Sequence, residues 1–316
     1  MLNSKFSQNF KIGDQTISEK NKALIIAEIG INHEGNISNC FKMIFAAQKS
    51  GADIIKLQVI DPDGSYEKGS ISYKLFNKSK LSREEIFNIY RLCKKKKIKI
   101  FSTFDKKNFE FFKNLNQSCY KISSSLTYDY FFIKKILATS KPTIISSGLS
   151  DLDDVNSLLN LIKKDKNNKI ALLHCRSIYP SELSKLHLSR IKYFKQKYNI
   201  ITGYSDHSLG VDAPVASIHY GAKIIEKHFT LDASRKSFDH KISLEPKEFK
   251  LMVKKIRENE AMIGKHNYKV FSKNQDFKKM SVFIRSFRLN RDVDSNKFLN
   301  QDDFDLIRKK DQKNIQ

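Results

Sequence analysis

Short runs rich in β-branched residues alternate with amphipathic segments along most of this chain, and this alternation constrains the fold more than any other feature. It is typical of βα units that build a parallel sheet. We count eight such runs: Leu24–Asn32, Ile54–Val59, Lys99–Phe104, Cys119–Ser125, Pro142–Gly148, Lys169–Cys175, Ile200–Asp206 and Lys223–Thr230. Eight strands, each followed by a helix, predict an α/β protein of the (β/α)8 TIM-barrel type. The Gly-rich dinucleotide loop of an open doubly wound sheet is not found.

Helical periodicity lies between these runs and after the last of them. We expect helices over Asn39–Ser50, Glu84–Lys97, Tyr130–Thr139, Leu152–Lys164, Leu188–Tyr198 and Pro246–Gly264. Before the first strand, the Gly13-Asp14 turn within Phe10–Ile17 predicts a short N-terminal hairpin. The character of the chain changes after the last helix. We therefore expect a barrel domain over 1–265, a linker over 266–280 and a further short segment over 281–316.

Composition excludes several classes of protein. No run approaches the roughly 20 apolar residues that a membrane helix needs, and the N-terminal region lacks the apolar core of a signal peptide. We therefore expect a soluble cytoplasmic protein with no membrane partner. The four cysteines (Cys40, Cys93, Cys119 and Cys175) include no CxxC pair, which indicates reduced and mostly buried thiols.

The strongly basic character of the chain does not indicate a nucleic-acid partner. The formal net charge is +24, but only ten of the 58 basic residues are Arg, the residue best suited to bidentate phosphate recognition. The Lys residues are spread along predicted solvated helix faces. We therefore expect no nucleic-acid binding, and only a weak attraction for anionic substrates.

Polar residues occur at the ends of all eight predicted strands, where the active sites of TIM barrels lie. Lys56 and Lys121 would bring two positive charges to this end of the barrel. Hydroxyl groups would surround them, from Thr103, Ser124, Ser146 and Ser205. Such a pocket suits a ligand that carries a phosphate and a carboxylate. Two structural alternatives stay open: a strand Lys can pair with a carboxylate on the next strand, and strand-end serines can cap the following helix.

Two histidines end neighbouring predicted strands and are candidate metal ligands. His207 and His228 could meet at one divalent ion, with Glu28 close by where the barrel closes. Two imidazole nitrogens completed by oxygens and water favour Mn²⁺ or Mg²⁺ over tetrahedral Zn²⁺. A strand-end histidine can equally be a hydrogen-bonded structural residue. The residues by themselves thus predict a barrel enzyme that acts on a small anionic substrate with a metal ion.

Several motifs identify the chain more closely. Between about residues 10 and 265 it resembles the sialic acid (N-acetylneuraminate) synthase family, which includes the legionaminic and pseudaminic acid synthases. The likeness is carried by Ala27-Glu-Ile-Gly-Ile-Asn-His-Glu-Gly35, Lys56-Leu-Gln58, Leu172-Leu-His-Cys175, Gly203-Tyr-Ser-Asp-His207 and Ile225-Glu-Lys-His-Phe-Thr230. The resemblance implies condensation of phosphoenolpyruvate with an N-acylated amino hexose (N-acetylmannosamine or a diacetamido-deoxy sugar), with C–O cleavage and phosphate release.

The resemblance also assigns roles to individual positions. It implies that His207 and His228 bind the metal ion and that Glu28 lies beside the metal and the sugar, these three being the catalytic residues. Tyr179 and Asp239 would contact the amino sugar. Phosphoenolpyruvate would be held by Lys56, Thr103, Lys121, Ser124, Ser146 and Ser205. Residues 281–316 look like a truncated antifreeze-like (SAF) segment, which in the family caps the active site of a partner in a homodimer.

The sequence departs from the family on the side of the sugar. Leu126 stands where an acidic residue is expected to touch the sugar, and Ser177 stands where an Asn is expected. Lys236-Ser-Phe238 replaces the Pro-Gly-Pro that precedes Asp239. These departures leave open a second hypothesis, namely a non-catalytic or regulatory sugar-binding paralogue of such a synthase.

Overall fold

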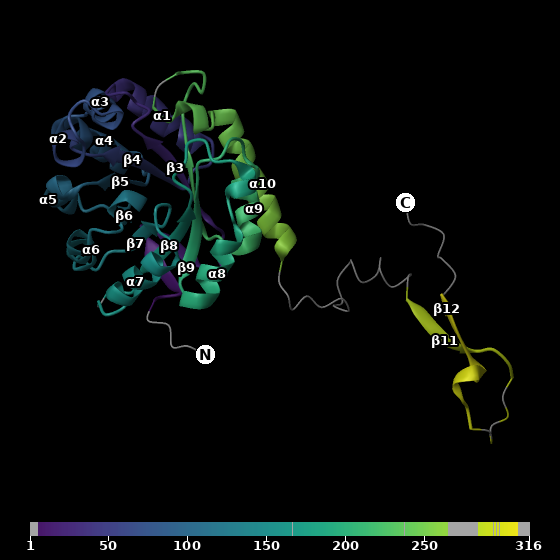
Figure 1. Cartoon of the computed structure of the whole chain (residues 1–316). Helices are drawn as coiled ribbons and strands as arrows, with labels where there is room; N and C mark the ends of the chain where they lie inside the picture. Colours follow the sequence, from purple (N-terminus) through teal and green to yellow (C-terminus); the bar gives the residue numbers. More distant parts are fainter. Residues whose placement is uncertain are drawn as a thin grey trace. The chain divides into compact units, whose positions relative to one another are not determined.

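The computed structural model of the protein describes residues 6–165, 167–236, 238–264, 284–292, 294, 296 and 298–308. The chain divides into two compact units, Met1–Ile263 and Gly264–Gln316, and each is described by itself. In the first unit the strands lie at the centre and the helices surround them (Figure 1).

The first unit contains a closed barrel of eight parallel strands, as predicted. In chain order they are β3 (Leu24–Gly30), β4 (Ile54–Val59), β5 (Ile100–Phe104), β6 (Tyr120–Ile122), β7 (Thr143–Ser146), β8 (Ile170–Cys175), β9 (Ile201–Asp206) and β10 (Ile224–His228). Each strand pairs with its neighbour in sequence, and β10 pairs with β3 to close the ring. In the closing register, His228 lies opposite Glu28. The barrel thus aligns the carboxyl ends of all eight strands at one rim.

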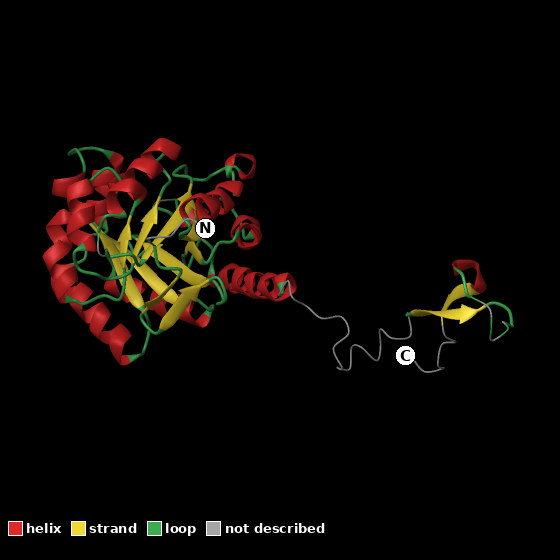
Figure 2. Ribbon diagram, turned by 90° about the horizontal axis from the view of Figure 1, so that it is seen from below, coloured by secondary structure: helices red, strands yellow, loops and turns green. Residues whose placement is uncertain are grey.

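Among the described residues, ten α-helices follow or flank these strands. Figure 2 shows helices around the barrel. Six of them confirm the predicted helices: α1 (Ile37–Lys49), α4 (Arg83–Lys95), α6 (Tyr130–Leu137), α7 (Leu152–Ile162), α8 (Ser189–Tyr198) and α10 (Pro246–Ile263). Four more were not predicted: α2 (Pro62–Ser65), α3 (Ile71–Lys78), α5 (Phe109–Asn114) and α9 (Asp212–Ser217). These four are at most eight residues long, too short to show a clear apolar stripe.

The predicted hairpin closes one end of the barrel. Its strands β1 (Asn9–Ile12) and β2 (Gln15–Ser18) pair in antiparallel register across the Gly13-Asp14 turn. The hairpin side chains Phe10, Ile12 and Ile17 join a buried cluster with side chains from inside the barrel, such as Leu24 and Ile54 at the amino ends of their strands. A second, larger apolar cluster lies between strands and helices. The hairpin therefore leaves the opposite rim for a binding site.

The second unit contains a two-stranded antiparallel sheet, β11 (Arg285–Leu289) and β12 (Phe304–Arg308). The side chain of Asn300 caps the short turn before β12, and Asp303 pairs with Arg291. The predicted linker over 266–280 lies outside the described residues, and the antifreeze-like character of 281–316 stays a prediction. Within the described parts of the chain, no helix is both long and apolar enough to span a membrane.

Candidate active site

A cavity of about 420 Å³ lies at the carboxyl ends of the barrel strands. Every side chain that the sequence predicted for the site lines it: Glu28, Lys56, Thr103, Lys121, Ser124, Ser146, Tyr179, Ser205, His207, His228 and Asp239. They come from seven of the eight strands or from the loops that follow the strands. The structure thus gathers at one place residues that are up to 211 positions apart in the sequence.

The two lysines belong to a buried charge network that the sequence did not predict. Lys56 forms ion pairs with Glu28 on the neighbouring strand and with Glu226 on β10, the latter at 2.8 Å. The Nζ of Lys121 lies 3.3 Å from Glu226 Oε1 and donates to Ser146 Oγ at 2.8 Å. Two carboxylates therefore balance the two cations, and the predicted doubly cationic pocket is in fact a neutral network. Both lysines pair with carboxylates, which was one of the open alternatives. Both also line the cavity, as predicted.

Glu226 is the member of this network that the predicted site omitted. Its carboxylate joins Lys56, Lys121 and the Oγ of Ser205, which donates to it at 2.9 Å. One signal could have found it: side chains two apart on a strand share a face, so Glu226 must point the same way as His228. The intervening Lys227 points outward and forms a fully buried ion pair with Asp206 at 2.6 Å. Asp206 and Lys227 therefore stabilise the wall of the barrel and do not line the cavity.

Burial shifts the protonation of this network. Removal from water lowers the pKa of Lys56 to about 7, although Glu226 opposes the shift. Burial would raise the pKa of Glu226, but Lys121 and Lys56 together hold that pKa well below its usual range. Near neutral pH, therefore, Glu226 is ionised and Lys56 is close to losing its proton.

The two histidines converge as predicted. The ring centroids of His207 and His228 are 5.4 Å apart, and the ring of Tyr179 lies against His207 at 4.2 Å. The Nδ1 of His207 lies 2.8 Å from the carbonyl oxygen of Arg176. In a neutral ring this contact requires Nδ1–H to donate, which leaves the lone pair of Nε2 available to a ligand. The Nδ1 of His228 lies 3.6 Å from Asp239 Oδ2.

Several buried polar atoms in the cavity have no hydrogen-bond partner among the described residues. They are the Oε1 of Glu28, the hydroxyl of Thr103 and the Nδ1 of His228, whereas the Oε2 of Glu28 faces Lys56 in an ion pair. Buried polar groups are rarely left unsatisfied, so such atoms on one cavity indicate a bound polar ligand. The described residues contain no group of three or more His, Cys, Asp or Glu side chains arranged around one point. If the cavity takes a metal ion, the protein ligands are the two imidazoles, and these fit an ion whose other ligands are oxygens.

The motif that contains Asn32 holds the loop that carries Asp239. The Oδ1 of Asn32 accepts from the backbone N–H of Asp239 at 3.0 Å, and its Nδ2 donates to Phe229 O and Ser243 Oγ. Phe238, just before Asp239, adopts a φ of 60°, a conformation that a side chain makes unfavourable. Asn32 is thus a positioning residue for Asp239. The sequence gave it no role, because its partners lie about 200 positions away.

The expectation that Leu126 faces the sugar is wrong. Leu126 is partly buried against the core between barrel and helices, and it does not line the cavity. The reason is local: the chain leaves β6 in a 3-10 turn over Ser124–Leu126, so the alternation of the strand ends at Ile122. Ser123, Ser124 and Ser125 line the cavity instead. Ser177 and Phe238, the other two departures from the family, do lie on the cavity wall.

Comparisons with known proteins agree on one family. The NeuB family model matches residues 43–268. An uncharacterised protein of Methanocaldococcus jannaschii is 36% identical over 258 residues, which are 81% of this chain and 77% of that protein. A pseudaminic acid synthase of Campylobacter jejuni is 34% identical over 303 residues, 91% of this chain and 87% of that protein. The crystal structure of a sialic acid synthetase from Leptospira borgpetersenii superposes with a TM-score of 0.80 at 29% identity, covering 87% of this chain and 95% of that one.

Proposed function

The chain belongs to the NeuB family, and on that premise we propose that it is a nonulosonic acid synthase that uses phosphoenolpyruvate. The acceptor is the open-chain aldehyde of an N-acylated amino hexose. The observation that carries the proposal is the cavity at the rim of the barrel, where paired lysines and hydroxyls adjoin two convergent histidines. These groups suit an anionic phosphate ester on one side and a polarised carbonyl on the other.

The proposed reaction forms one C–C bond and breaks one C–O bond. C3 of phosphoenolpyruvate attacks the aldehyde carbon, and the aldehyde oxygen takes up a proton to become a hydroxyl. Water adds to C2 and loses one proton. As the C2–O bond to the phosphate breaks, the second proton of that water passes to the leaving phosphate and C2 becomes a carbonyl. Inorganic phosphate leaves, and a 2-keto-3-deoxy acid remains. Every atom of the two substrates and of one water molecule is accounted for.

The side chains of the cavity divide into two groups in this proposal. Lys56, Lys121 and Ser146 hold the phosphate and the carboxylate of phosphoenolpyruvate, together with the hydroxyls of Thr103, Ser124 and Ser205. Tyr179 and Asp239 orient the amino sugar, and Asn32 fixes the position of Asp239. The Oε1 of Glu28, which has no hydrogen-bond partner among the described residues, would accept a proton or a hydrogen bond from the reacting groups. Burial keeps these charged contacts strong, because little water competes for them.

We propose that His207 and His228 hold Mn²⁺ or Mg²⁺ in this cavity. When bound, such an ion supplies Lewis-acid polarisation of the aldehyde carbonyl. The donor set supports the assignment, because two imidazoles leave room for oxygen ligands, and the Cys175 thiol on the same cavity contacts the Nδ1 of His207 and not its Nε2. The carbonyl of Arg176 orients His207, as is usual for a ligating imidazole.

The pH dependence of phosphoenolpyruvate binding should follow from Lys56, which faces Glu28, Glu226 and Lys121. The complex needs Lys56 charged, whereas the free protein loses this proton as the pH rises through about 7. Phosphoenolpyruvate binding should therefore weaken above pH 7, by up to about tenfold per pH unit. Calorimetry at pH 8 in two buffers of different ionisation enthalpy should reveal proton uptake. Lys56→Met should remove that uptake, and the same uptake in both proteins would contradict the prediction.

The proposed function is tested by phosphate release from phosphoenolpyruvate against a panel of 2-acetamido and 2,4-diacetamido hexoses. With ¹⁸O in the bridging oxygen of phosphoenolpyruvate, C–O cleavage places the label in the released phosphate. We expect acceptor-dependent release of labelled phosphate together with a 2-keto acid. Saturable sugar binding without phosphate release, with Mn²⁺ and Mg²⁺ both supplied, would instead support the non-catalytic sugar-binding paralogue.

Within this panel we expect N-acetylmannosamine to be a poorer acceptor than a diacetamido-deoxy sugar. Part of the cavity wall is apolar, formed by Tyr66, Phe76, Leu149 and Phe238. A hydroxyl that meets this wall loses its hydrogen-bond partner, at a cost of about 1–3 kcal/mol, whereas a methyl or acetamido group does not. Comparison of kcat/KM for the two sugars measures the preference. A higher value for N-acetylmannosamine would contradict it.

Leu126→Glu should not improve the use of N-acetylmannosamine. Because Leu126 packs against the core, the substitution should instead lower the free energy of unfolding by about 1–3 kcal/mol. Ser125→Glu is the matched variant, since Ser125 lies on the cavity wall. An improved kcat/KM in Leu126→Glu would show that this side chain reaches the sugar.

The oligomeric state also remains a proposal. We propose a homodimer in which residues 281–316 form an antifreeze-like cap over the active site of the partner. Sedimentation equilibrium of the full chain tests this assembly, and a monomer at micromolar concentration would contradict it.

A further inference from the structure

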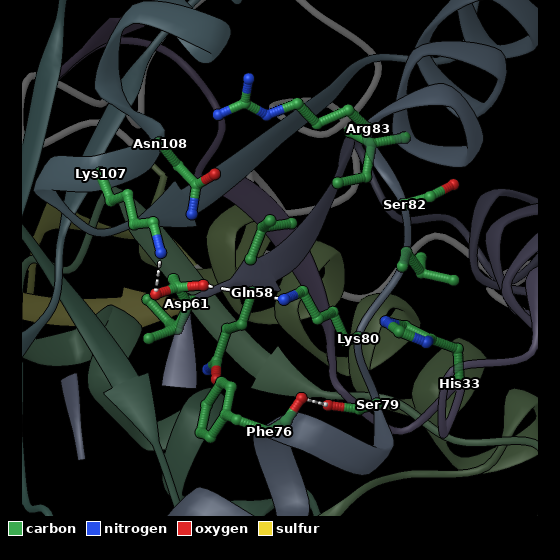
Figure 3. Close-up of a pocket in the computed structure, with 14 residues that line it drawn as sticks. His33, Gln58, Asp61, Phe76, Ser79, Lys80, Ser82, Arg83, Lys107 and Asn108 are labelled. Carbon is green, nitrogen blue, oxygen red and sulfur yellow. Dashed lines mark hydrogen bonds and ion pairs between the residues drawn. The ribbon is translucent and has the colours of Figure 1, made fainter. Parts of the chain in front are cut away.

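A second cavity, of about 250 Å³, lies beside the active-site cavity. The two cavities share three lining residues, Gln58, Ile60 and Phe76, which therefore form the wall between them. Figure 3 shows this second cavity. Its lining residues come from the end of β4 and the residues after it, the chain from the end of α3 to the start of α4, the segment after β5, and His33 after β3. Apart from Phe76 in the shared wall, none of the residues assigned to substrates or metal in the proposed function lines it. The feature therefore needs its own explanation.

Positive charge dominates the lining of this cavity. Lys80, Arg83 and Lys107 supply three cations, and Asp61 is the one carboxylate among the described lining residues. Asp61 lies 2.8 Å from the Nζ of Lys107 and 3.8 Å from the Nζ of Lys80 (Figure 3). A single carboxylate shared by two lysines leaves the cavity with a net charge of about +2.

The amino end of α4 opens on the same cavity, where Ser82 and Arg83 line it. This helix has 13 residues, and its capping box satisfies the N–H groups of Ser82 and Glu85. The other N–H groups of the first turn have no partner within the helix and carry its positive dipole end. Backbone donors thus add to the cationic side chains.

A buried histidine supplies an independent indication of a ligand. His33 is 2% exposed and lines the cavity, and its Nδ1 accepts from the backbone N–H of Gly35 at 3.1 Å. Burial lowers the pKa of His33 to about 4, so the ring is neutral and its one proton lies on Nε2. The contact with Gly35 occupies Nδ1 alone, so Nε2–H is available to a ligand in the cavity that the ring lines.

We propose that this second cavity binds a phosphate group. Nε2–H of His33, the amino end of α4 and the ammonium groups of Lys80 and Lys107 are all donors, and a tetrahedral oxyanion accepts from several donors at once. Two sources share this chemistry. One is a phosphate carried by the acceptor sugar and reaching past Gln58. The other is free inorganic phosphate, the product of the proposed reaction.

Binding of inorganic phosphate, measured by calorimetry, tests the site. The protein carries Lys121→Met throughout, so that the lysine network of the active site does not dominate the signal. In this background we expect Lys80→Gln/Lys107→Gln to weaken phosphate binding at least tenfold. The control is Lys106→Gln/Lys113→Gln, which makes the same change in charge at exposed lysines that pair with Asp129 and Glu110 outside the cavity. Absence of phosphate binding in the background, or equal binding in both double variants, overturns the proposal.

A kinetic comparison distinguishes the two sources, and only this comparison rests on the proposed function. With Lys121 intact, Lys80→Gln/Lys107→Gln is assayed with an acceptor sugar and with its 6-phosphate. A rise in KM of tenfold or more for the phosphorylated acceptor alone assigns the site to the substrate. Unchanged KM values, with phosphate binding lost in calorimetry, assign it to the free ion. If no acceptor turns over, the proposed function fails, while the binding measurement still decides the second site.

Discussion

Replacing either His207 or His228 with alanine should lower kcat about a thousandfold. Polarisation of a carbonyl by a bound metal ion is worth several kcal/mol, and each 1.4 kcal/mol or so changes a rate tenfold. Each variant would keep one imidazole of a pair whose rings are 5.4 Å apart. Equilibrium dialysis should show stoichiometric Mn²⁺ bound to the parent protein and none to either variant.

A surface histidine provides the control for this experiment. His219 is exposed and lies 2.7 Å from Asn259, away from the cavity. His219→Ala should keep both Mn²⁺ binding and activity. Chelation should inactivate the parent protein, and Mn²⁺ or Mg²⁺ should restore it. Full turnover by a chelated protein that elemental analysis finds free of metal would contradict the assignment of His207 and His228 as metal ligands.

Replacing Lys56 with alanine should affect stability and binding together. The substitution leaves Glu28 without its cation and leaves Glu226 with Lys121 alone, all inside the barrel. Removing one member of a buried ion pair typically costs about 3–5 kcal/mol, and we expect a loss of this size in the free energy of unfolding by urea. The lost charge-assisted contact should also weaken phosphoenolpyruvate binding by about tenfold to a hundredfold.

Two further variants separate the two effects. Lys56→Ala/Glu28→Gln removes one of the uncompensated carboxylates, so it should recover part of the stability without recovering phosphoenolpyruvate binding. Lys99→Ala is the surface control, because Lys99 pairs with the exposed Asp14 and should change stability by less than about 1 kcal/mol. A Lys56→Ala protein as stable as the parent would mean that the network does not stabilise the folded state.

The sequence alone was sufficient to predict the barrel and the rim at which the candidate site residues gather. Eight short β-branched runs separated by helical segments leave few alternatives to a closed parallel barrel, which the structure contains. In such a barrel all strands run the same way, so residues at their carboxyl ends meet at one rim whatever their separation in sequence. Lys56, Lys121, His207 and His228 could therefore be assigned to one cavity before their distances were known.

Only the tertiary structure decided how these residues are paired. Glu226 joins Lys56 and Lys121 across the barrel, and no pattern in the sequence encodes a distance between side chains on non-adjacent strands. Leu126 was misplaced because a 3-10 turn ends the alternation of β6, and the direction of a side chain after a strand depends on the turn that follows. The cavity that His33 lines is made by four stretches of the chain that meet only in the fold. The periodicity of apolar residues and the order of strands and helices are local properties of a chain. Charge pairing and cavities depend instead on packing between distant segments.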